Sequence, residues 1–242
     1  MGRHPKDRSD YYRAKIWFSI IAESIGSSSP RHLERLFQPN NLKRNLDGKI
    51  VDSRSWDKYK KGDRLPKDGV NHQGFSFAVH AAESVVPDSA YIFRHPLWYL
   101  LRHGGQSYSQ TAETIFGFKN YVRRFYFDLD LLSEGDILGS FGSSIGEAIA
   151  IGSDDDFVDV FDHLYAQSAI LNIVNFRHRE EHYFVIAENL STVLRHLAKA
   201  PWIRGIYQEF FDYLEMVVFG DLFDKYYMVD IYSRSAWRKS FP

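Results

Sequence analysis

The chain has 242 residues, of which 44% are hydrophobic and 16% aromatic, and it contains no cysteine. So many aromatic side chains support a sizeable core and exclude a disordered chain. The lack of cysteine excludes disulfides, thiolate metal sites and cysteine nucleophiles.

Charge is distributed unevenly along the chain, although the net charge is only −1. Residues 1–70 hold 16 Lys/Arg and 9 Asp/Glu, a net +7, whereas residues 71–242 hold 14 and 22, a net −8. This segregation predicts that the front of the chain meets a polyanion. The alternative is a basic surface that is solvated or that docks on the acidic half of the same protein.

No segment is typical of a membrane protein. Residues 1–10 are polar and lack the apolar core of a signal peptide, and no apolar run approaches the ~20 residues that span a bilayer. The most apolar candidate, 137–151, is interrupted by Glu147 and three serines, so we interpret it as a Gly/Ser-rich connection leading into a packed helix. We expect a soluble, cytoplasmic protein with no membrane partner.

The first predicted helix covers residues 10–25. Ser9 or Asp10 is expected to cap its start, and Gly26, followed by three serines, ends it. Apolar residues three and four apart mark its inward side: Tyr12, Ile16, Trp17, Ile20 and Ile21.

A short second helix is predicted to start at Pro30, with Ser29 as its cap, and to stop at Pro39. Its inward residues are expected to be Leu33, Leu36 and Phe37. Asp47 and Gly48 then form a turn signal, which predicts a small loop or hairpin over 45–51.

A third helix is predicted over 53–61, with the Ser53 hydroxyl as its cap and Gly62 at its left-handed end. Trp56 and Tyr59 are three apart and should pack inward, which turns the basic side chains outward. Helix-start side chains can contact base edges and lysines can contact phosphates. The predicted nucleic-acid-binding residues are Arg54, Ser55, Lys58, Lys60, Lys61 and Arg64.

Ser53, Trp56, Tyr59, Gly62, Arg64 and Pro66 resemble the end of the recognition helix in Cro/repressor-type (XRE-like) helix-turn-helix domains. The resemblance covers about 14 residues and implies DNA binding. The chain departs from that family in two ways: residues 38–52 separate the second and third helices, and basic Lys58 and Lys60 replace an acidic residue. This segment and His95 to Trp98 together are similar to those of an uncharacterised proteobacterial protein group.

A Gly/Pro-rich stretch over 62–74 is the best linker candidate. Beyond it, apolar residues at helical spacing predict helices over 75–86, 92–103, 115–129, 157–171, 183–197 and 203–217. We therefore expect a mainly α fold with a helix-turn-helix-like region over 1–70 and a multi-helix body over 75–242, either separate from it or continuous with it.

Catalytic candidates are few. His178-Arg-Glu-Glu181-His182 matches the H-x-x-E-H zinc motif of inverted zinc peptidases, but no third ligand is evident, so we interpret it as a charged turn. The acidic cluster of Asp154, Asp155, Asp156, Asp159 and Asp162 is interpreted as a solvated face at a helix start. His80 is expected to be a hydrogen-bonded core histidine. We expect no metal, no cofactor and no catalytic site.

The leading hypothesis is a nucleic-acid-binding accessory or regulatory protein of a bacterial mobile-element or defence-type system. Its partner is double-stranded DNA, bound by residues 1–70, and its helical body mediates assembly with a protein partner or a second copy. The alternative is a non-enzymatic protein-interaction module or a subunit of a larger complex, with basic and acidic faces that bind proteins.

Overall fold

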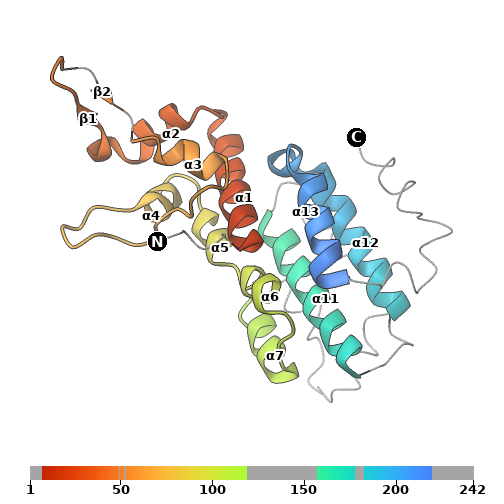
Figure 1. Cartoon of the computed structure of the whole chain (residues 1–242). Coiled ribbons are helices and arrows are strands. Elements are labelled where there is room, and N and C mark those ends of the chain that lie inside the picture. The colour runs from red at the N-terminus through yellow and green to blue at the C-terminus, as the bar shows by residue number, and fades with distance from the viewer. Residues whose placement is uncertain (1–6, 49, 52, 119–156, 178–182, 220–242) are drawn as a thin grey trace, which may run out of the picture. The chain divides into compact units, whose positions relative to one another are not determined.

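The computed structural model describes residues 7–48, 50–51, 53–118, 157–177 and 183–219 (Figure 1). This part of the chain is built from helices, with one short two-stranded hairpin. The prediction of a mainly α fold is therefore confirmed. In the described residues, no helix is both long and apolar enough to cross a membrane.

The chain divides into two compact units: Met1–Trp98 with Pro201–Ile206, and Tyr99–Ala200 with Tyr207–Pro242. The boundary between Trp98 and Tyr99 falls inside helix α6 (Leu97–His103). The Gly/Pro-rich stretch over 62–74 thus lies within the first unit, which also takes up a short segment from late in the sequence.

Helix α1 (Arg8–Ile25) starts two residues earlier than predicted. The cap is Asp7 rather than Ser9 or Asp10, since the Asp7 carboxylate accepts from the Ser9 N–H at 2.8 Å. Gly26 ends the helix in the left-handed conformation, as predicted. The residues expected on the inward side are all buried: Tyr12, Ile16, Trp17, Ile20 and Ile21.

Helix α2 (Pro30–Phe37) begins and ends where the sequence predicts. The Ser29 hydroxyl accepts from the His32 N–H, and Leu33 and Phe37 are buried. The inward assignment of Leu36 was wrong, because Leu36 is 47% exposed.

The predicted hairpin is confirmed between α2 and α3. It follows a 3-10 turn, η1 (Pro39–Asn41), and pairs β1 (Lys43–Arg44) antiparallel with β2 (Ile50–Val51). Its turn is closed by the Gly48 N–H, which donates to the Asn45 carbonyl, and Gly48 has a φ of 73°. A left-handed residue after a tight turn matches the right-handed twist of paired strands.

Three short helices follow: α4 (Ala78–Glu83), α5 (Ser89–Arg94) and α6. The prediction of one helix over 75–86 was too long, since Phe75 and Val85 lie outside α4 and are each 50% exposed. The single segment expected over 92–103 is two helices. The His95 Nδ1 accepts from the Leu97 N–H at 3.1 Å, which caps α6 at its start.

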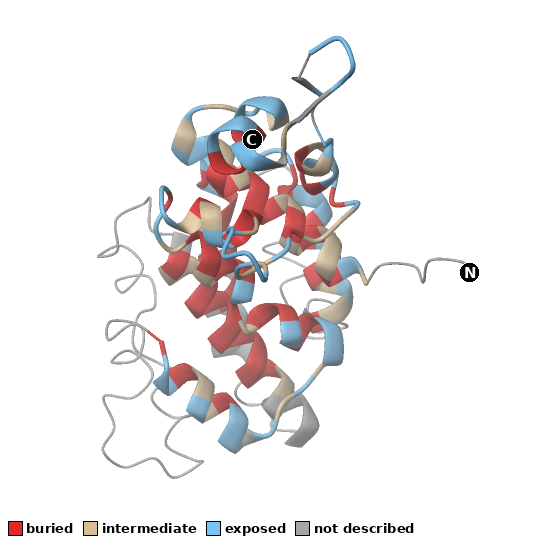
Figure 2. Ribbon diagram, turned by 90° about the vertical axis from the view of Figure 1, so that its left-hand side faces the viewer, coloured by how far each residue is buried: buried red, intermediate tan, exposed pale blue. Residues whose placement is uncertain are grey.

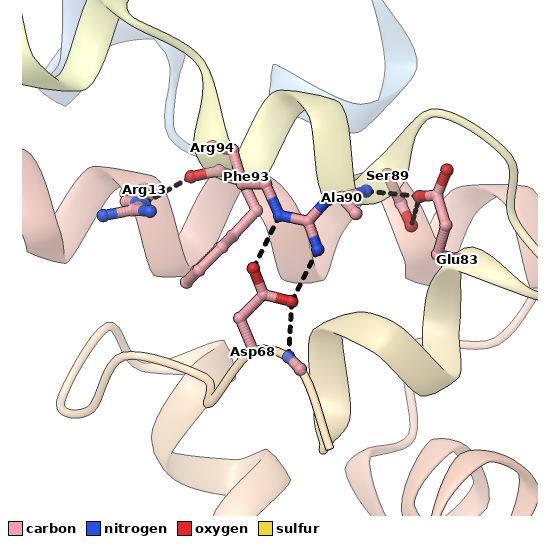
Figure 3. A network of polar contacts seen from close by, with 8 residues as sticks. Arg13, Asp68, Glu83, Ser89, Ala90, Phe93 and Arg94 are labelled. Atoms are coloured by element: carbon pink, nitrogen blue, oxygen red, sulfur yellow. Dashed lines mark hydrogen bonds and ion pairs between the residues drawn. The ribbon is translucent and has the colours of Figure 1, made fainter. Parts of the chain in front are cut away.

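Helix α5 is held at both ends by side chains from elsewhere in the first unit (Figure 3). At its start, the Glu83 carboxylate accepts from the backbone N–H groups of Asp88 and Ala90. At its end, the Asp68 carboxylate pairs with Arg94 at 2.6 Å. The hydrogen bond from Arg94 lowers the pKa of Asp68. The stretch over 62–74 is therefore tied into the unit rather than free of it.

An apolar cluster of buried side chains lies in the first unit. Figure 2 colours the ribbon by burial, with buried residues in red. The cluster combines aromatic rings from α1, α2, α3 (Ser55–Lys60) and α5 with small residues from α4 and α5. The largest members are Trp17, Phe18, Phe37, Trp56, Tyr59 and Phe93.

The second unit is centred on α11 (Phe157–Arg177), which packs against α12 (Tyr183–Lys199) and α7 (Tyr108–Phe116). Its last described helix, α13 (Tyr207–Leu214), continues into the π-helical turn η5 (Glu215–Phe219). The predictions over 157–171 and 183–197 are confirmed. The helix expected over 203–217 was placed four residues too early, because a 3-10 turn, η4 (Pro201–Ile203), precedes α13.

Candidate nucleic-acid interface

Helix α3 is fixed to the first unit by two aromatic side chains. Trp56 is fully buried, and its ring stacks on Phe37 with the centroids 5.4 Å apart. Tyr59 is also buried and meets Trp17 edge-on at 6.1 Å. A helix of six residues is not stable alone in water, so this packing on α1 and α2 is what gives α3 its place.

Polar contacts tie the beginning of α3 to α2. The Trp56 indole N–H donates to the Gln38 side chain at 3.1 Å, in a buried setting. Ser53 donates to the Glu34 carboxylate and accepts from the Ser55 N–H at 3.1 Å. The helix thus begins at Ser55 rather than Ser53. The prediction of Ser53 as its cap was wrong, because the N-cap residue is Arg54 and no side chain caps the helix.

Three of the six predicted binding residues have exposed side chains. Arg54, Lys58 and Lys61 are all exposed, and within the described part of the chain none of them forms a side-chain hydrogen bond or ion pair. Lys58 lies on α3, and Arg54 and Lys61 are its N-cap and C-cap residues. The helix and its caps therefore present a basic surface whose position is set by the buried Trp56 and Tyr59.

The other three predicted residues are engaged within the protein. Lys60 is exposed but donates to the Ser28 carbonyl at 3.0 Å, which ties α3 to the α1–α2 turn. Ser55 is half-buried, and its N–H donates to the Ser53 hydroxyl at 3.1 Å. Burial raises the pKa of Tyr59, and the charge of half-buried Arg64 opposes that rise. Arg64 therefore lies close enough to influence the phenol.

Arg54 has an unusual backbone. Its φ of 57° is in the left-handed region, which non-glycine residues adopt only at a cost of about 1–2 kcal/mol. Asp88 is the only other non-glycine residue of the described chain in that region. Such strain is concentrated at functional sites, and here it directs the turn from which α3 starts.

Gly62 ends α3 in a left-handed conformation, as the sequence predicts. A Cβ at this position would lie 2.5 Å from the Tyr11 ring on α1. The glycine thus meets two requirements at once: the positive φ of 71° and the close approach of the chain to α1.

The connection between α2 and α3 is longer than the tight turn of a Cro/repressor domain. Residues 38–54 intervene and contain η1 and the hairpin. The two helices still contact each other, through Phe37, Gln38 and Trp56. Gln38 and Glu34 were missed at the sequence level because neither is apolar; their positions at the end of α2 were the available signal.

Other candidate sites gain no support. The H-x-x-E-H motif at 178–182 and Asp154, Asp155 and Asp156 lie outside the described residues. In the part of the chain that the structure describes, no group of His, Asp or Glu side chains could hold a metal ion. The solvated-face interpretation was wrong for Asp162, which is buried, and the core assignment was wrong for His80, which is exposed.

Comparisons with protein-family models, curated proteins and solved structures find no match for this chain.

Proposed function

We propose that the first unit binds double-stranded DNA through α3, and that the protein is an accessory or regulatory DNA-binding protein. The observation that carries this proposal is the combination of buried Trp56 and Tyr59 on α3 with three exposed cationic residues, Lys58 on the helix and Arg54 and Lys61 at its two caps. The net +7 of residues 1–70 supports it, because phosphate contacts supply most of the affinity of DNA-binding proteins.

The roles within this surface follow from side-chain chemistry. Lys58 and Lys61 are point charges suited to phosphates, whereas the fork of Arg54 is suited to the O6 and N7 atoms of guanine. Lys60 positions the helix through Ser28 and adds its charge to the same field. Residues 71–242, with a net charge of −8, repel DNA, so binding is confined to the first unit. These acidic residues are then available for assembly with a protein partner or a second copy.

The salt dependence of DNA binding tests the phosphate contacts. Replacing Lys58 and Lys61 with Ala should weaken binding of a mixed-sequence duplex and lower the slope of log K against log salt by about 0.9 per lost phosphate contact. Fluorescence anisotropy between about 50 and 200 mM salt measures both quantities. Lys199→Ala, which removes an exposed lysine from α12, is the matched control and should change neither.

Arg54→Gly tests the base contact with little risk to the fold, because glycine adopts the φ of 57° without strain. It should relax sequence preference by about 1–3 kcal/mol at one base pair while changing non-specific binding less. Binding that is negligible at physiological salt for the unchanged protein, or tight binding that survives the double lysine replacement, contradicts the proposal. The first result favours the rival function, a protein-interaction module.

A further inference from the structure

The β1–β2 hairpin ends in an apolar side chain that nothing in the first unit covers. Leu46 is 107% exposed, whereas the next most exposed large apolar residue of the described chain, Met216, is 58% exposed. Figure 1 shows the hairpin extending away from the helices of the unit. Folding gains nothing from a leucine in this position, because its side chain stays in water.

The hairpin is also basic. Residues 43–51 contain Lys43, Arg44 and Lys49 against one acidic residue, Asp47. The Asn45 amide donates to the Asp47 carboxylate across the turn. The polar side chains at the tip therefore bond to each other, and the apolar side chain stands beside cationic strands.

The hairpin is joined directly to the proposed DNA-binding helix. β2 ends at Val51 and α3 begins at Ser55, while β1 follows α2 and η1. The chain runs from Leu42 through β1 to the turn that carries Leu46, which is four residue steps, and four steps of a strand reach at most roughly 13 Å. That reach is comparable to the width of a DNA major groove, about 12 Å, so an arm of this length can extend from α3 to the neighbouring minor groove.

We infer that the β1–β2 hairpin is a second DNA-contacting element. While α3 contacts the major groove, the hairpin places Leu46 against the neighbouring minor groove, and the inserted side chain bends the duplex at that point. This inference rests on the proposed function. Its chemistry is that of apolar wedges, which enter between base steps from the minor groove and kink the duplex by ~20–90°. The positive charge of the β1 sequence, Lys43 and Arg44, favours an approach to phosphates. The apolar tip gains a buried surface only in the complex.

DNA bending separates this role from simple affinity. The probe is a duplex of about 30 base pairs with a central TA step, which kinks easily, labelled at both ends for energy transfer. The unchanged protein should shorten the end-to-end distance on binding. Leu46→Ser should bind with an affinity within about tenfold of the unchanged protein and lose the bend, whereas Leu46→Met should retain it.

Two controls accompany this measurement. Met216→Ser removes the next most exposed apolar side chain, from outside the first unit, and should leave the bend unchanged. Thermal unfolding of Leu46→Ser should match the unchanged protein, because the side chain lies fully in solvent. A bend lost on Leu46→Ser alone supports the inference.

The remaining outcomes distinguish the two proposals. Binding that depends on Lys58 and Lys61 but leaves the duplex straight, or a bend that Leu46→Ser does not change, overturns the role of the hairpin and leaves the proposed function standing. An unchanged protein that does not bind the duplex overturns both.

Discussion

Trp56 fixes the orientation of α3, and it thereby determines where the exposed lysines of that segment lie. The indole lies against Phe37 in a stacked arrangement and within 6.3 Å, centroid to centroid, of Trp17, Phe18 and Tyr59. Its N–H is satisfied by Gln38. A buried aromatic side chain whose N–H is also hydrogen-bonded holds the helix in one orientation. The lysines on the opposite side of the helix are therefore held facing outward.

Gly62 offers the sharpest prediction at the scale of single residues. Gly62→Ala should lower the free energy of unfolding by about 2–4 kcal/mol, because the new Cβ meets the Tyr11 ring at 2.5 Å and the φ of 71° strains any L-residue. Urea unfolding followed by tryptophan fluorescence measures it, since Trp17, Trp56, Trp98 and Trp202 all belong to the first unit.

Gly69→Ala is the matched control for that prediction. Gly69 has a φ of 80°, but a Cβ there would meet nothing within 4 Å. Gly69→Ala should therefore lower the free energy of unfolding only by the backbone strain, about 1–2 kcal/mol. Equal effects of the two substitutions would show that the approach to Tyr11 does not matter.

Several residue roles could be predicted from the sequence because they depend on near neighbours. The cap at Ser29, the left-handed glycines at 26 and 62, and the inward Trp56 and Tyr59 all follow from local spacing and turn chemistry. The contacts of Lys60 with Ser28, and of Ser53 with Glu34, could not be predicted. They join residues 32 and 19 positions apart, and no local pattern records which carbonyl or carboxylate a side chain reaches.

At the scale of elements, α5 shows how a very short helix is stabilised by groups outside itself. It has six residues and no side-chain cap of its own, since its N-cap residue, Asp88, makes no such bond. Glu83 supplies the missing acceptor from the preceding helix, and its charge also suits the positive end of α5 (Figure 3).

Removing that acceptor should destabilise the first unit. Glu83→Ala leaves the N–H groups of Asp88 and Ala90 without their partner, at a cost of about 1–3 kcal/mol. Glu83→Gln keeps one acceptor oxygen, so its free energy of unfolding should lie between those of Glu83→Ala and the unchanged protein. The measurement is the urea midpoint from tryptophan fluorescence.

Glu23→Ala is the control for Glu83→Ala. Glu23 is exposed on α1 and should change stability by no more than about 0.5 kcal/mol. If Glu83→Ala is equally neutral, water replaces the carboxylate and the capping role is wrong.

The same short elements explain where sequence patterns failed. Apolar residues over 75–86 and 92–103 continue at helical spacing across the ends of α4, α5 and α6, so periodicity merges or lengthens helices that tertiary contacts interrupt. Long helices were predicted more accurately: α11 and α12 have enough turns for the apolar pattern to show that they exist and where they begin, although α11 continues past the predicted end at 171 to Arg177.

At the scale of the whole molecule, the division into two units depends on contacts between distant parts of the sequence. η4 packs on α1, although nearly 180 residues separate them in the chain. The boundary between Trp98 and Tyr99 lies inside α6, a helix that contains no glycine or proline. A prediction from local composition therefore placed the boundary at the Gly/Pro-rich stretch over 62–74.

The interior of the second unit contains polar side chains on α11. Asp162, His163, Gln167 and Ser168 are all buried. Burial, with a smaller contribution from His196, lowers the pKa of His163 from 6.5 to about 4. The unfolded chain therefore binds a proton between those two values that the folded chain does not bind.

This difference predicts a loss of stability on mild acidification. Above pH 6.5 His163 is neutral in both states and its contribution is complete; as the pH falls from 6.5 towards 4, protonation of the unfolded state removes it. Between pH 7 and pH 5 the free energy of unfolding should fall by about 2 kcal/mol through this residue. Urea unfolding followed by far-UV circular dichroism at several pH values measures the slope.

His163→Gln should flatten that slope whatever its effect at pH 7, whereas His72→Gln, which replaces an exposed histidine, should leave it intact. Identical slopes for the unchanged protein and His163→Gln would mean that His163 is protonated as readily in the folded state as in the unfolded one, and that its burial is not maintained in solution.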